Sequence, residues 1–237
     1  MNATIIFKFL ADIANNNNRQ WFQEHKGAYE KAKGEFEQGV DELIKVIATF
    51  DPSIAHLTAK DCCYRFYRDT RFSKDKSPYK RHFGAFISAH GKKSLHGGYY
   101  IHLQPGHSLF AIGCWCLPTN ILTSIRNEIM GNIDEWRASV EGGEFIHLFG
   151  YPCEAEWVGE LPTREKGFGA SCLKTAPKDF PRDYEFIDYL KMKNYCAWRC
   201  VGDDFFQKRD WADNTAGMLK VAKPMMDFVN SVVDDYE

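Results

Sequence analysis

The chain has 237 residues, 44% of them hydrophobic and 15% aromatic, which is enough apolar side chain to bury a sizeable core in one large domain. Its formal net charge is only −2, which excludes a global positive field that would gather nucleic acid or an anionic membrane. Any electrostatic function must therefore come from a local cluster of charges.

Eight cysteines are present, but nothing else in the sequence indicates secretion. Residues 1–10 lack the basic start and the small-residue cleavage site of a signal peptide. We therefore expect a cytoplasmic protein with reduced cysteines. The longest stretch without a formal charge, residues 97–125, is broken by Pro105, Gly106 and Pro118, so no membrane segment is expected.

The first fifth of the chain predicts two helices. Apolar residues recur at helical spacing over residues 5–13, and the asparagines at 15–18 end that helix. A longer helix is expected over residues 21–47, where the apolar positions keep a period near 3.6. It can be interrupted near Gly27, Gly34 or Gly39.

Strands follow after residue 52. Alternating patterns predict strands over residues 64–72 and 83–89, and then over 99–103 and 108–116. The last two are joined by a turn with Pro105 and Gly106 at its central positions, which is typical of a hairpin. Connections this short favour an antiparallel sheet.

The second half of the chain predicts helices that flank a loop-rich region. A helix is expected to begin after Pro118, with a shorter one over residues 133–140. Glycines and prolines indicate loops over residues 142–181. Helices return over residues 183–193 and 203–233, and Pro224 should kink or divide the last one.

Together these elements predict an α+β fold in a single domain over residues 1–237. An antiparallel sheet of about four or more strands, roughly residues 64–116, is expected to pack against N-terminal and C-terminal helices.

The most unusual feature is the cationic segment, residues 65–82, which holds seven Lys or Arg against two Asp in a slightly acidic protein. On a strand, Arg65, Tyr67, Asp69 and Arg71 would share one face. Arginine forks bind carboxylate or phosphate in a bidentate manner, and lysines of the following loop can add charge. The segment contains no glycine, so it is no Walker loop.

We therefore expect a site for a small anionic ligand, one that can carry phosphate. Its expected residues combine the cations of the segment with neighbouring polar groups: Arg65, Arg68, Asp69, Arg71, Lys74, Lys76, Tyr79, Lys80, His102 and Lys174. The structural alternative is that Arg65, Asp69 and Arg71 form cross-strand ion pairs, with the lysines on a solvated turn.

Two further motifs accompany the Asp-Thr-Arg-Phe-Ser-Lys-Asp-Lys string of residues 69–76: Asn-Asn-Arg-Gln-Trp-Phe at residues 17–22 and Gly-Gly-Tyr-Tyr-Ile-His-Leu at 97–103. With these motifs the chain resembles the bacterial DUF2461 family over nearly its whole length. The resemblance implies one full-length domain in a bacterial cytoplasm. It implies no catalytic residue.

Other functions are less favoured by the sequence. No ligand spacing of a metal site is present, so no metal and no cofactor is expected. The second hypothesis is a non-catalytic interaction module that docks an acidic partner, with a nucleic acid backbone as the less favoured case. A third is a hydrolase with His82 or His102 as its base. The sequence leaves the identity of the ligand and the oligomeric state open.

Overall fold

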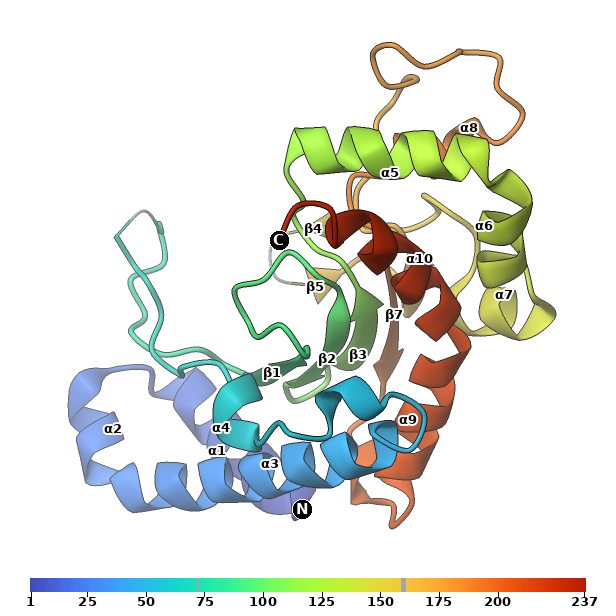
Figure 1. Ribbon diagram of the computed structural model, residues 1–237. Helices are drawn as coiled ribbons and strands as arrows, with labels where there is room; N and C mark the ends of the chain where they lie inside the picture. Colours follow the sequence, from blue (N-terminus) through green and yellow to red (C-terminus); the bar gives the residue numbers. More distant parts are fainter. Residues whose placement is uncertain (72, 159–160) are drawn as a thin grey trace. The chain divides into compact units, whose positions relative to one another are not determined.

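The computed structural model describes residues 1–71, 73–158 and 161–237 (Figure 1). The chain divides into two compact units. The first comprises Met1–Lys92, Tyr100–Leu109 and Val201–Ala216, and the second comprises Lys93–Tyr99, Phe110–Cys200 and Gly217–Glu237. Within the described residues, no helix is long and apolar enough to cross a membrane.

The helices and strands follow one another in this order: α1 (Ala3–Asn15), α2 (Arg19–Glu24), α3 (Lys26–Ile47), the 3₁₀ turn η1 (Pro52–Ile54), α4 (Ala59–Cys62), β1 (Phe83–Ile87), β2 (Gly98–Leu103), β3 (Ser108–Gly113), α5 (Thr119–Gly131), α6 (Ile133–Val140), α7 (Gly143–Phe149), β4 (Trp157–Val158), β5 (Leu161–Pro162), β6 (Lys166–Phe168), α8 (Ile187–Lys191), β7 (Cys196–Val201), the 3₁₀ turn η2 (Phe205–Gln207), α9 (Trp211–Val221) and α10 (Lys223–Val233).

The strands form an antiparallel five-stranded sheet in the order β1-β2-β3-β7-β6, together with a small antiparallel β4–β5 pair. The predicted α+β class is therefore confirmed. The β2–β3 hairpin is also confirmed, with a positive φ at Gly106 where its turn requires one.

The first unit is built around an aromatic core packed against helices α1 and α3, which lie side by side (Figure 1). Helix α3 buries Ala32, Phe36, Val40, Leu43 and Ile47, which recur every three or four residues along one face. Rings from α1, α2, α3, β1 and the cationic segment meet in this core: Phe9, Phe22, Tyr29, Phe36, Phe66, Tyr79 and Phe83.

The second unit packs α10 against α5 and α6. Its centre is Trp136, a fully buried ring that contacts Phe168, Tyr195 and Phe228. The guanidinium of Arg126 is also buried there, and it donates hydrogen bonds to the carbonyl oxygens of Leu190 and Met192 at 2.7 and 3.0 Å. Division of the last predicted helix near Pro224 is confirmed, because α9 ends at Val221 and α10 begins at Lys223.

The predicted strand over residues 64–72 is wrong. Only isolated bridges join Cys63 to Ala85 and Tyr67 to Tyr79, and Phe72 lies outside the described residues. The carboxylate of Asp69 instead accepts a hydrogen bond from the backbone N–H of Arg71, which offers the chain a local turn in place of a ladder. The sheet extends instead through β7 and β6, beyond the predicted residues 64–116.

The expectation of reduced cysteines is wrong at one pair, because Cys153 and Cys172 form a disulfide. Their neighbours bring them together: Pro152 bridges to Phe168 at the end of β6, and Cys172 bridges to Met192. These contacts are not local in sequence, so residue spacing alone did not reveal the pair. The cytoplasmic location stays a prediction.

We predict that the double variant Cys153→Ser/Cys172→Ser lowers the free energy of unfolding by about 3 kcal/mol, because the bond closes a loop of 19 residues in the unfolded chain. Urea denaturation of the wild type with its disulfide formed, and of the double variant, measures the difference. The control is Cys116→Ser, which removes an exposed free thiol. Equal stability of the double variant and the wild type would contradict the prediction.

Candidate functional site

The cationic segment is fastened to the corner between α1 and α2 by one asparagine. The Asn17 side chain donates to the backbone carbonyl of Tyr79 at 2.9 Å and accepts from the backbone N–H of Tyr79 at 3.1 Å. The amide side chain thus makes the two backbone hydrogen bonds that a neighbouring strand would otherwise make. The Tyr79 ring is 2% exposed and stacks on Phe22 of α2, with ring centroids 4.1 Å apart.

The segment has two limbs, residues 65–68 and 78–82, which are held together by a short run of backbone hydrogen bonds. The Arg68 N–H donates to Pro78 O and the Lys80 N–H donates to Phe66 O, both at 2.9 Å. Residues 69–71 and 73–77 are the described parts of the loop between the limbs, and Figure 1 shows them projecting away from the helices. The segment is therefore a ribbon with only a minimal ladder.

Most of the charge on the loop is satisfied within the loop. The Arg68 guanidinium binds the Asp75 carboxylate at 2.6 Å and donates to the Ser77 carbonyl at 3.2 Å. Hydrogen bonds from Ser77, followed by the one from Arg68, hold the pKa of Asp75 well below its usual range. Arg68 therefore organises the loop.

A second ion pair also lies within the loop. The Arg71 guanidinium forms two hydrogen bonds with the Asp69 carboxylate, at 3.0 and 2.7 Å, and lowers the pKa of Asp69 to about 2. The pair joins residues two positions apart, so it is not the cross-strand arrangement considered from the sequence. Lys76 donates to the Thr70 carbonyl at 2.9 Å.

The remaining expected residues lie apart from these pairs. Arg65 and Lys74 are exposed to solvent. The ammonium of Lys80 lies over the Tyr64 ring, 5.3 Å from its centroid. Lys174 is exposed and belongs to the second unit.

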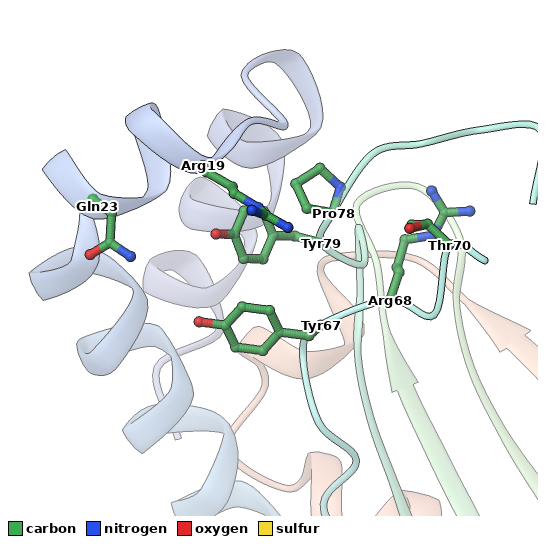
Figure 2. Close-up of a pocket in the computed structure, with 7 residues that line it drawn as sticks. All are labelled: Arg19, Gln23, Tyr67, Arg68, Thr70, Pro78 and Tyr79. Carbon is green, nitrogen blue, oxygen red and sulfur yellow. The ribbon is translucent and has the colours of Figure 1, made fainter.

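A cavity of about 250 Å³ opens between α2 and the cationic segment (Figure 2). Its lining combines two arginines, two tyrosines and three smaller groups: Arg19, Gln23, Tyr67, Arg68, Thr70, Pro78 and Tyr79. In Figure 2 the side chains of Arg19, Tyr67 and Tyr79 gather on one side, whereas the Arg68 guanidinium points away from them. The structure thus brings together three of the segment's residues that were expected or considered: Tyr67, Arg68 and Tyr79.

Sequence reasoning missed Arg19 and Gln23. They are four residues apart, so they share one face of α2. Among the described residues, the Arg19 guanidinium has no carboxylate partner, and no carboxylate is among the lining residues. The sequence did place Arg19 within the Asn-Asn-Arg-Gln-Trp-Phe motif, which was the one signal that could have found it. Its contact with the cationic segment depends on tertiary structure and could not be predicted from that motif.

Comparison with known protein families identifies the family of this chain. The family model described as "Conserved hypothetical protein (DUF2461)" matches residues 5–228. The chain belongs to the DUF2461 family. No curated protein and no solved structure matches the chain.

This DUF2461 protein also carries a buried pair of histidines, formed by His82 at the end of the cationic segment and His102 on β2. The rings of His82 and His102 stack with centroids 4.1 Å apart, and the two residues are 8% and 2% exposed. Burial lowers the pKa of His82 to about 2 and the pKa of His102 to about 4. The positive charges of Lys80 and Arg68 add to the effect on His82, so both rings are neutral at pH 7.

We predict that the protein loses stability as the pH falls below about 6.5. The unfolded histidines have a pKa of about 6.5. The pKa values in the folded protein are lower, about 4 and about 2. In the pH range between the unfolded and the folded values, the unfolded chain therefore binds more protons than the folded protein, and stability falls as the pH falls. His82→Phe keeps the ring stack but removes one titrating group, so it should reduce the loss of unfolding free energy between pH 7 and pH 5 by about 2 kcal/mol.

Urea denaturation of both proteins at several pH values measures this difference. Between pH 7 and pH 8 the two curves should run parallel, because there His82 takes up almost no proton in either state. An identical loss between pH 7 and pH 5 in wild type and variant would contradict the prediction.

Proposed function

We propose that this DUF2461 protein binds a small phosphate-bearing anion in the cavity between α2 and the cationic segment. The observation that carries the proposal is the Arg19 guanidinium, which lies at a cavity lined by no carboxylate and has no carboxylate partner among the described residues. A guanidinium offers five N–H donors in a planar fork that matches the oxygens of a phosphate.

The neighbouring groups support an anion. Gln23 can donate through its amide, and Tyr67 and Tyr79 can donate through their hydroxyl groups. The nearby carboxylates, Asp69 and Asp75, are already paired with arginines and so do not compete for the cavity.

The size of the cavity favours a small ligand. Sites for drug-sized molecules enclose about 300–1,000 Å³. A cavity of about 250 Å³ is therefore suited to a phosphate group with a small organic part. Tyr67 is 51% exposed, so its ring is available to contact that part.

We predict that inorganic phosphate raises the midpoint of thermal unfolding of the wild type, relative to chloride at the same ionic strength, and that small phosphorylated metabolites raise it further. Arg19→Gln should weaken phosphate binding by about tenfold to a hundredfold, because it removes a charge-assisted hydrogen bond. Thermal shift and isothermal titration calorimetry measure the two effects.

The matched control is Arg209→Gln, which removes an exposed arginine of the same unit that lies outside the cavity lining. It should leave phosphate binding unchanged. A wild type that does not respond to phosphate, or an Arg19→Gln variant that responds like the wild type, would refute the proposed site. Salt-sensitive binding to an acidic polymer that persists in Arg19→Gln would instead favour the interaction module.

A further inference from the structure

A line of polar side chains runs along one face of β2 and into the turn that follows it. Because side chains alternate on a strand, Tyr100, His102 and Gln104 share this face while Ile101 and Leu103 take the other. The Tyr100 hydroxyl lies 3.0 Å from Nδ1 of His102, and Nε2 of His102 lies 3.2 Å from Oε1 of Gln104. The three groups form a continuous chain of hydrogen bonds.

Gln104 determines which nitrogen of His102 carries the proton. An amide oxygen can only accept, so Nε2 of His102 must be the N–H donor. Nδ1 of the neutral ring is then an acceptor, and the Tyr100 hydroxyl donates to it. The order of tyrosine, histidine and glutamine is that of a hydroxyl group, its base and the residue that orients the base.

Residues of β1 and His82, which directly precedes it, hold this arrangement in place. His82 stacks on the His102 ring with an interplanar angle of 26° and so limits its rotation. A Cβ atom added to Gly84 would lie 3.0 Å from the Tyr100 hydroxyl oxygen, which is tighter than an ordinary contact. Glycine at this position leaves the hydroxyl group its space.

Tyr100, at one end of this hydrogen-bonded series, lies beside an exposed tyrosine and a lysine. Tyr100 is partly exposed, and its ring centroid lies 6.5 Å from that of Tyr64, which is 40% exposed. The Lys80 ammonium over the Tyr64 ring places a positive charge here. A carbonyl oxygen that becomes negative during a reaction would be stabilised by such a charge.

We propose that Tyr100 is a catalytic nucleophile for acyl transfer from small carboxylic esters, with His102 as its base and Gln104 as a positioning residue. The Tyr100 oxygen forms a bond to the ester carbonyl carbon while its proton passes to Nδ1 of His102. The bond to the alcohol oxygen then breaks, and that oxygen takes the proton from His102. The oxygen of a water molecule then bonds to the acyl carbon and gives a proton to His102. The bond between the Tyr100 oxygen and the acyl carbon breaks, the Tyr100 oxygen takes that proton back, and the carboxylic acid leaves. This inference uses residues outside the anion cavity, so its test is independent of the test of the proposed anion site.

The test uses p-nitrophenyl acetate, followed by peptide mass spectrometry that locates each acetyl group. Tyr100 should be acetylated about tenfold faster than Tyr67 of the same molecule, although Tyr67 is 51% exposed. This gain is below the usual range of general-base catalysis, because burial lowers the pKa of His102 to about 4 and makes it a weaker base. In His102→Phe the rate at Tyr100 should fall to that of Tyr67. Equal rates at the two tyrosines of the wild type would overturn the proposal.

Gln104 supplies a second test that does not depend on the folding of the His102 variant. Gln104→Leu removes the acceptor for Nε2 and should slow acetylation of Tyr100, whereas Gln104→Glu keeps an acceptor and should restore it. Tyr151→Phe, at an exposed tyrosine of the second unit, is the matched control and should leave the rate unchanged. Equal rates in Gln104→Leu and Gln104→Glu would remove the assigned role of Gln104, and with it the proposed relay.

Discussion

The pair of hydrogen bonds between the Asn17 side chain and the backbone of Tyr79 is the interaction on which the candidate site depends. The cationic segment has too few ladder bonds to hold its own position, and its loop is charged and largely exposed. Asn17 supplies a donor and an acceptor at one point, and this lets Tyr79 bury its ring against Phe22. The anchored ring forms one wall of the cavity, and α2 forms another.

Charge pairing explains which cations remain for a ligand. A segment with seven Lys or Arg would repel itself if all of these charges were free. Asp69 engages Arg71, Asp75 engages Arg68 and lies 4.0 Å from the Arg81 guanidinium, and a backbone carbonyl engages Lys76. The loop is thereby stabilised from within. The guanidinium that faces the cavity without a carboxylate comes from outside the segment, from Arg19 on α2.

The sequence predicted those parts of the fold that depend on local patterns. Helix α1, the α2–α3 region with its break beside Gly27, and the β2–β3 hairpin all follow from periodicity and turn residues. The strand over residues 64–72 was predicted from alternation, but among the described residues of this range only Tyr67 forms a bridge, to Tyr79. The Cys153–Cys172 disulfide and strand β7 depend on contacts distant in sequence, which no local pattern reports.

For the candidate site, the sequence identified the right segment but not the role of each cation. Charge composition cannot distinguish Arg68, which organises the loop, from Arg19, which faces the cavity. That distinction is made by Asp75, seven residues away from Arg68 along a loop whose conformation is set by its own hydrogen bonds. His102 was predicted as a site residue, and its contacts with Tyr100 and Gln104 follow from strand alternation once β2 is known.

Amide hydrogen exchange in Asn17→Ala tests most directly whether this residue anchors the cationic segment. The amides to follow are those of Arg68 and Lys80, which close the short ladder between the limbs. Loss of two hydrogen bonds, worth about 2 kcal/mol together, should lower the protection of both amides by about thirtyfold. Asn15→Ala, which removes an exposed side-chain bond within α1, is the control and should leave them unchanged. Unchanged protection of Arg68 and Lys80 in Asn17→Ala would contradict the account.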